Sequence, residues 1–257
     1  GAGGNLGVCT GPDGVLLIDS QFAELSDKIK AAIATVSKEP VRYLFNTHYH
    51  GDHTGGNENF GNAGAVIVAQ DNVYRRLSVD FKSPLTGRES KAVPPKARPV
   101  ITFNDTASFH INGRTVIVFH VRPAHTDGDA IVWFPEANVI HTGDCLFNGR
   151  YPVIDAGAGG TVDGMIAAAE RILAMANAET QIIPGHGPLS KRSDVEAFRD
   201  MLKEVRSKLA PLIAQKKTIK EIQEARPLAS LDAKWGADST RSANFVGMAV
   251  YAMPAAK

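Results

Sequence analysis

The chain has 257 residues, 44% of them hydrophobic, which is enough to bury a sizeable core as a single domain over residues 1–257. Its 28 basic and 27 acidic residues leave a net charge of +1, so the composition gives no electrostatic footprint for nucleic acid or for a membrane surface. No run of about 18 apolar residues is present to span a bilayer. The two cysteines, Cys9 and Cys145, are far apart in the sequence and indicate no disulfide.

Apolar runs typical of strands alternate along the chain with runs of helical periodicity. The predicted strands are 15–18, 41–45, 65–69, 115–121, 130–134, 139–141 and 181–183. The predicted helices are 22–36, 72–77, 162–177, 193–215 and 218–225. Because strands and helices alternate, the pattern favours layered α/β architecture.

A dense cluster of imidazoles and carboxylate follows the strand predicted at 41–45. His48, His50, Asp52 and His53 lie within six positions, and these side chains are ligands that zinc accepts. Without a metal, such imidazoles would repel one another when protonated or leave ring nitrogens unpaired when buried. If the extended backbone continues, His48 and His50 point to the same side and share one ion, while Asp52 and His53 serve a second.

Further ligands are expected in loops that directly follow other predicted strands and contain glycine or proline. His125, Asp144 and His186 lie in such loops, where functional groups on a rigid scaffold tend to be placed. The remaining histidines fall in or at the ends of strands, and we expect structural roles for them. They are His110, His120 and His141.

These motifs, in their order and spacing, resemble the metallo-β-lactamase superfamily from about Gly4 to the last helix. Asp19, at the end of the first predicted strand, resembles the buried strand-end aspartate near the metal loop of that family. The resemblance implies a four-layer αββα sandwich with a metal site at one edge, between the two sheets. The motifs that carry it are His48-x-His50-x-Asp52-His53, His125, Gly143-Asp144 and Gly185-His186-Gly187.

The resemblance also implies two zinc ions per chain and a hydrolase in which a hydroxide shared by the ions attacks a carbonyl carbon. Asp52 is the expected catalytic carboxylate, because it can orient that hydroxide. No Gly-x-Ser-x-Gly motif supports a serine mechanism. The implied ligands are His48, His50 and His125 for the first ion, Asp52, His53 and His186 for the second, and Asp144 as a bridge.

Cys145 is the alternative ligand of the second ion, since some β-lactamases of the superfamily use a cysteine in this region. Adjacent residues on an extended chain point in opposite directions, so Asp144 and Cys145 are not expected to bind the same ion. We favour Asp144, because a carboxylate can span two zinc ions, and expect Cys145 to pack in the core.

Two regions are candidates for substrate binding. Asn148, Arg150 and Tyr151 follow the Asp144 loop and are expected to line the cleft, with Arg150 pairing with a substrate carboxylate. The proline-rich segment 73–100 predicts a long loop or partly helical flap that attracts an anionic substrate, with a solvated surface loop as the alternative. Its basic residues are Arg75, Arg76, Lys82, Arg88, Lys91, Lys96 and Arg98.

Three functions compete on this sequence. The first is zinc-dependent hydrolysis of β-lactams, hence antibiotic resistance, and the second is hydrolysis of thioesters, esters or lactones on the same scaffold. A non-hydrolytic metal-binding or oxygen-handling protein is disfavoured, because the ligand set suits zinc at least as well as iron. We expect a monomer that acts on a small molecule. The chain begins at Gly1 without a signal peptide, and a cleaved export signal would make it periplasmic or secreted.

Overall fold

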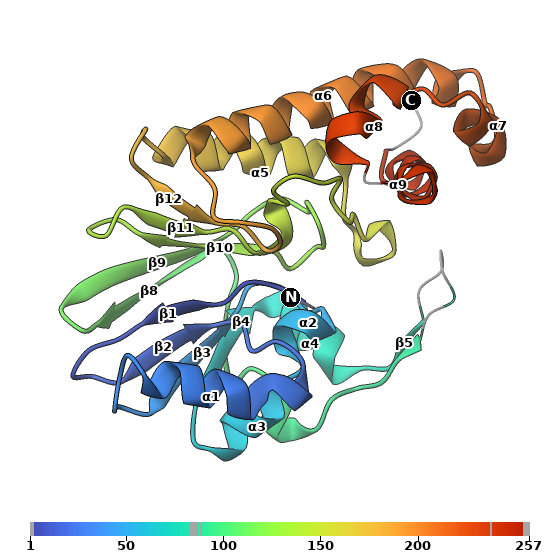
Figure 1. The fold of residues 1–257 in the computed structure, drawn as a ribbon. Coiled ribbons are helices and arrows are strands. Elements are labelled where there is room, and N and C mark those ends of the chain that lie inside the picture. Colours follow the sequence, from blue (N-terminus) through green and yellow to red (C-terminus); the bar gives the residue numbers. More distant parts are fainter. Residues whose placement is uncertain (1–2, 83–86, 88, 237, 254–257) are drawn as a thin grey trace.

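The computed structural model describes residues 3–82, 87, 89–236 and 238–253. Within these residues two β-sheets lie face to face, and helices cover the outer face of each sheet (Figure 1). The protein is therefore the four-layer αββα sandwich that the sequence predicts. Among the described residues, no helix combines the length and the apolar character needed to cross a bilayer.

The first sheet is formed by the N-terminal part of the chain. Its strand order is β1-β2-β3-β4-β7, with β1 antiparallel to β2 and the other neighbours parallel. Side chains alternate along a strand, so Leu16 packs in the core between the sheets while Leu17 packs beneath helix α1. The elements are β1 (Gly7–Cys9), β2 (Val15–Ile18), β3 (Val41–Asn46), β4 (Val66–Gln70), β7 (Ile101–Phe103), α1 (Ser26–Ala34) and α3 (Asn57–Asn62).

The second sheet has the strand order β12-β11-β10-β9-β8, and its neighbours are antiparallel except β11 and β12. Its outer face forms the largest apolar cluster with the C-terminal helices, which cover it in Figure 1. The elements are β8 (Thr106–Ile111), β9 (Arg114–His120), β10 (Ala130–Phe134), β11 (Val139–His141), β12 (Gln181–Ile183), α5 (Val162–Met175), α6 (Arg192–Ala214), α7 (Ile219–Glu224), α8 (Ala229–Trp235) and α9 (Ser239–Tyr251).

Short elements connect the layers at the edge where the predicted ligands lie. They are α2 (Gly51–Thr54), α4 (Asp71–Ser78), β5 (Phe81–Lys82), β6 (Glu89–Ser90), and the 3₁₀ helices η1 (Ala23–Leu25), η2 (Pro95–Ala97), η3 (Gly143–Cys145) and η4 (Ala156–Ala158). Every predicted strand is present within one residue at each end. The expected continuation of the extended backbone to His50 is wrong, because β3 ends at Asn46 and the chain bends before α2.

Candidate metal centre

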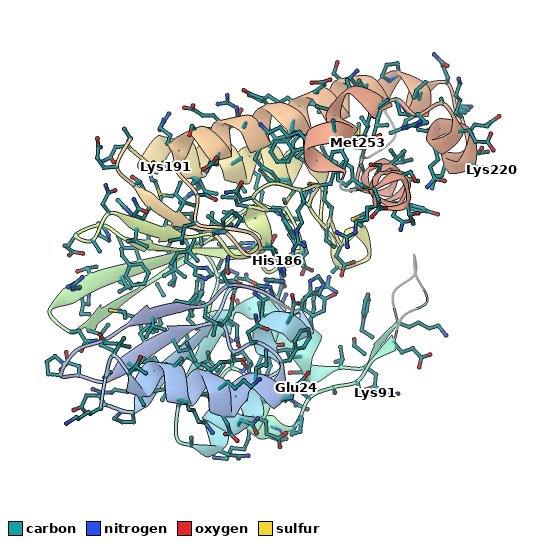
Figure 2. All side chains as sticks on the ribbon, in the orientation of Figure 1. Glu24, Lys91, His186, Lys191, Lys220 and Met253 are labelled. Atoms are coloured by element: carbon teal, nitrogen blue, oxygen red, sulfur yellow. The ribbon has the colours of Figure 1, made fainter. Side chains whose placement is uncertain are left out.

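The predicted ligands converge from five separate segments of the chain. They come from the bend after β3, from α2, and from the loops that follow β9, β11 and β12. Figure 2 shows His186 in the middle of the molecule, where these segments meet. Within each of three groups the ligand atoms lie within 4.8 Å of one another, and the groups are His48, His50 and His125; His48, His53 and Asp144; and Asp52, His53 and His186.

Asp144 lies at the centre of these groups. Its Oδ1 atom is 3.2 Å from His53 Nε2. Its Oδ2 atom is 3.9 Å from His48 Nε2, 3.5 Å from His125 Nε2 and 3.4 Å from His186 Nε2. A carboxylate that faces histidines of both sets is placed to bridge two cations.

Two histidines of the first group have one ring nitrogen committed to the protein. His125 Nδ1 donates to the carbonyl oxygen of Val153 at 2.7 Å. His50 Nε2 donates to Asp155 Oδ2 at 3.0 Å, and the remaining nitrogens, His50 Nδ1 and His125 Nε2, lie 2.8 Å apart. These bonds set the tautomers, so the nitrogens without a hydrogen face the centre of the group.

His48 and His53 also have one ring nitrogen, Nδ1, committed to the protein. His48 Nδ1 lies 3.1 Å from the hydroxyl oxygen of Thr47, and His53 Nδ1 donates to Asp19 Oδ2 at 2.7 Å. Thr47 is itself bonded to Asp19 through both its backbone N–H and its hydroxyl. Asp19 is fully buried at the end of β2, beside the metal-ligand bend, as the resemblance implied.

The inward-facing atoms fit a metal ion. Among the described residues, His48 Nε2, His53 Nε2 and Asp144 Oδ1 are buried without a hydrogen-bond partner. Buried polar atoms without partners are costly, and three that face one point are expected where a cation completes their coordination. The donor set of imidazole nitrogens and carboxylate oxygens suits zinc.

The pKa values of the histidines differ between the two predicted ligand sets. Burial lowers the pKa of His48 well below its ordinary value and that of His125 to about 4, so both rings are neutral and ready to ligate. Burial acts in the same direction on His53, but the Asp144 and Asp19 carboxylates outweigh it and raise the pKa of His53. Hydrogen bonds that His186 donates to Asp144 and Asp52 likewise outweigh burial and raise the pKa of His186 to about 9.

The loop that carries His186 is held by the N-terminal segment and by an aromatic ring. The Asn5 side chain donates to the carbonyl oxygens of Pro184 and Gly187 at 2.9 Å each, on both sides of the ligand. The ring of His186 stacks on Phe147, with centroids 5.1 Å apart and an interplanar angle of 18°. Asn5 therefore fixes the backbone, and Phe147 fixes the ring.

Sequence reasoning missed several residues that orient the ligands. Asp155, Asn5, Thr47 and the Val153 carbonyl belong to no recognisable motif. The available signal for Asp155 was its position in the glycine-containing stretch that follows Asp144. Their roles depend on which residues the fold brings together.

Two residues that follow Asp144 in the sequence, Cys145 and Tyr151, are buried in the core. Cys145 is a buried free thiol in the apolar cluster beneath the second sheet, and burial raises its pKa. Tyr151, expected to line the cleft, is instead 8% exposed, with its ring stacked on Phe245 at 4.2 Å and its hydroxyl donating to Asp232. Its ring packs in the core because the C-terminal helices cover it.

The other two substrate candidates lie nearer the ligands. The guanidinium of exposed Arg150 lies 5.4 Å from the ring centroid of Phe147, which stacks on His186. Asn148 donates its backbone N–H to the carbonyl oxygen of His186 and its side chain to the carbonyl of Pro188. Arg150 is therefore within reach of the centre, whereas Asn148 is tied to the His186 loop.

The basic segment 73–100 forms α4, the β5–β6 hairpin and η2. Three of its basic residues pair with carboxylates: Arg76 bonds Asp127 through two nitrogens at 2.7 Å each, and Lys82 and Lys91 pair with Glu89 and Asp80. Arg75 and Arg98 instead donate to uncharged acceptors, the side chain of Asn72 and the carbonyl oxygen of Val93. The segment therefore keeps cations that no carboxylate of the described residues neutralises, and its attraction for an anionic substrate stays a prediction. Arg88 lies outside the described residues.

The histidines expected to be structural belong to none of the ligand groups formed by the described residues. His110 is exposed on β8, and His120 Nδ1 donates to the carbonyl oxygen of Asp129 at 2.8 Å. His141 is buried and accepts from the backbone N–H of Gly143 at 3.2 Å. Their contacts are with the protein backbone or the surface.

Comparison with known proteins agrees with this geometry. The family model described as the metallo-beta-lactamase superfamily matches residues 2–208. The chain is 26% identical over 194 residues to the metallo-beta-lactamase IND-1 of Chryseobacterium indologenes, with 74% of each chain covered. It is 28% identical over 148 residues to a hydroxyacylglutathione hydrolase of Rhodospirillum rubrum, covering 57% of this chain and 48%, about half, of that protein.

Solved structures show the same fold. A metallo-beta-lactamase from Pontibacter korlensis superposes with a TM-score of 0.62 at 22% identity, covering 76% of this chain and 85% of that one. The metallo-beta-lactamase IND-7 gives a TM-score of 0.62 at 21% identity, covering 78% and 86%. Because the family model spans most of its length and the fold agrees, this chain belongs to the metallo-β-lactamase superfamily and is a metallo-hydrolase of that family.

Proposed function

We propose that the protein is a zinc-dependent hydrolase with β-lactams as its substrates. The observation that supports a two-zinc site most directly is the position of Asp144, whose oxygens face histidines of both ligand sets within 3.9 Å. His48, His50 and His125 would hold the first ion. Asp52, His53 and His186 would hold the second, with Asp144 shared.

When bound, zinc supplies Lewis acidity, because it lowers the pKa of a water molecule towards neutrality and polarises a carbonyl oxygen. Asp52 is the carboxylate placed to orient the attacking water. Burial acts to raise the pKa of Asp52, but the hydrogen bond from His186 and the charge of His53 outweigh it and lower that pKa. Asp52 therefore stays ionised at neutral pH and can accept a hydrogen bond or a proton.

Arg150 supports an anionic substrate. It is exposed, close to the His186 side of the centre, and makes no ion pair with a described residue. A β-lactam carries a carboxylate beside the scissile amide, and a guanidinium can bind such a group through two hydrogen bonds. Arg150 would thus place the ring carbonyl over the ligand cluster.

Thioester or lactone hydrolysis is the second candidate. The specific observation in its favour is that the carboxylate of Asp144, and not the thiol of Cys145, faces the ligand groups. The similarity to a hydroxyacylglutathione hydrolase agrees with this reading. Both candidates use the same site, so only the preferred carbonyl differs.

A parallel assay separates the two candidates. Zinc-loaded protein is tested on a chromogenic cephalosporin, a thioester and a lactone, each with a chelator control. Chelator-sensitive turnover that strongly favours the cephalosporin supports the proposal. Turnover that favours the thioester or lactone, with only a trace on the cephalosporin, refutes β-lactams as the substrates and keeps the hydrolase.

The role of Arg150 has its own test. Arg150→Ala should raise KM for an anionic cephalosporin roughly 10-fold, because a hydrogen bond to a charged group is worth about 1.5 kcal/mol. The matched control is Arg114→Ala, an exposed arginine at the start of β9, about 20 Å along the strand from His120, after which the chain leads to the His125 loop. An unchanged KM in Arg150→Ala would remove this residue from substrate binding.

The remaining expectations concern the whole protein. We propose two zinc ions per chain, a monomer, a single domain over residues 1–257 and export to the periplasm or the medium. Metal analysis by mass spectrometry tests the first, and light scattering on a sizing column tests the second. A single calorimetric unfolding transition would support one domain. Fractionation of the native host tests the export.

A further inference from the structure

The C-terminal helices α8 and α9 lie beyond residue 208, where the family model ends. They nevertheless contact the loop that accepts hydrogen bonds from His125 and His50. In Figure 1 they lie beside the yellow-green loop that follows η3, on the helical side of the second sheet. This loop includes Tyr151–Asp155. Its two sides make different contacts.

One side of the loop is fixed to the helices. The backbone N–H of Tyr151 donates to the carbonyl oxygen of Trp235 at 2.8 Å, and its ring stacks on Phe245 with an interplanar angle of 9°. Ile154 is 1% exposed, and its N–H donates to the sulfur of Met248. Residues from both helices therefore set the position of the loop.

The other side of the loop orients two ligands of the first ion. The Val153 carbonyl accepts from His125 Nδ1 at 2.7 Å, and Asp155 Oδ2 accepts from His50 Nε2 at 3.0 Å. Tyr49 adds a hydrogen bond to the same oxygen of Asp155 at 2.7 Å. Only the short backbone of Tyr151–Asp155 separates the contacts with the helices from the contacts with the histidines. A shift of the helices should therefore move the Val153 carbonyl and the Asp155 side chain.

We propose that α8 and α9 are a positioning element of the first zinc site, with Phe245 and Met248 acting on His50 and His125 through the Tyr151–Asp155 loop. The inference rests on the proposed zinc site. Outer hydrogen-bond partners of histidine ligands typically change metal affinity 10–100-fold when they are lost. The second site has no such contact with these two side chains among the described residues, so its affinity is independent of them.

The test measures zinc affinity directly, by competition with a chromophoric chelator. The first site is measured in a His186→Ala background and the second in a His50→Ala background. Phe245→Leu removes the ring stack, and Met248→Leu removes the sulfur acceptor while nearly conserving volume. The control is Ile172→Val, in the same apolar cluster. It lies about 15 Å along α5 from Val162, whose backbone N–H donates to the carbonyl oxygen of Ala252 just beyond α9.

Phe245→Leu and Met248→Leu should weaken the first site about 10-fold, leave the second unchanged, and keep a cooperative thermal transition without metal. The inference is overturned if the first site is unaffected, if both sites weaken equally, or if Ile172→Val has the same effect. Wild-type protein that binds no zinc would overturn this inference and the proposed function together. Zinc binding without cephalosporin turnover would refute only the proposed substrate.

Discussion

Asp19→Asn should move the ring hydrogen of His53 onto Nε2, the nitrogen that faces the metal site. The substitution barely alters the shape of the site. Asp19 has a φ of 62°, a conformation that asparagine tolerates well, so the backbone is undisturbed. The asparagine oxygen must accept from the backbone N–H of Thr47, as Asp19 Oδ1 does now at 2.8 Å. Its NH₂ group then takes the place of Oδ2, which now accepts from His53 Nδ1.

An NH₂ group cannot accept, so His53 must release the hydrogen on Nδ1 and carry it on Nε2. That hydrogen would point at Asp144 Oδ1, 3.2 Å away, where the second ion belongs. Restoring the ligating tautomer costs a charge-assisted hydrogen bond, about 1.5–3 kcal/mol, which corresponds to roughly 10–100-fold in zinc affinity. The first site, which does not contain His53 in its three-histidine group, should be unaffected.

Chelator competition measures the affinities, and nitrogen-15 NMR of the metal-free protein, at a pH where His53 is neutral, reports which of its nitrogens carries the hydrogen. The matched control is Asp163→Asn, a half-exposed aspartate paired with Arg206 on the outer helices. Asp19→Asn protein that holds both ions as tightly as wild type, or that keeps the hydrogen on Nδ1, would refute this reasoning.

Three further outcomes are expected. Asp144→Ala should lower zinc affinity and turnover by more than about 100-fold, because it removes a ligand and not merely an outer partner. Cys145→Ala should keep both ions and cost about 1 kcal/mol of stability. Metal analysis in which Cys145→Ala loses an ion and Asp144→Ala keeps both would make Cys145 the ligand. Asn5→Ala should weaken zinc binding at the second site about 10-fold. Stability should change little, since the freed carbonyls of the His186 loop can bond water. Equal zinc affinities of the variant and the wild type in a chelator titration would contradict this. In metal-free protein, the pKa of His186 is raised from 6.5 to about 9. The stability that this protonation contributes is therefore complete below pH 6.5 and lost as the pH rises to about 9. The Tm of the metal-free protein should fall over this pH range, and His186→Gln should abolish that fall.

The seven strands that the sequence predicted each carry a local signal. The run at 15–18 is apolar and fully buried, and the run at 41–45 ends in the buried pair Leu44 and Phe45, so hydrophobicity marks both runs. Strand β8 was missed because its residues alternate between exposed and partly buried, and the short β1 and β7 offer too few positions for a pattern. Helices α8 and α9 were missed because their core contacts lie far away in sequence.

By itself the sequence determined the ligand types, their spacing and the layered fold, because zinc chemistry and strand patterning depend on residue identity and local order. Only the tertiary structure decided what surrounds the ligands. Asp19, Asp155 and the Val153 carbonyl set the tautomers of histidines 28–105 residues away along the chain. Such hydrogen bonds leave no periodic trace in sequence, because they depend on where separate loops meet after the sheets have packed.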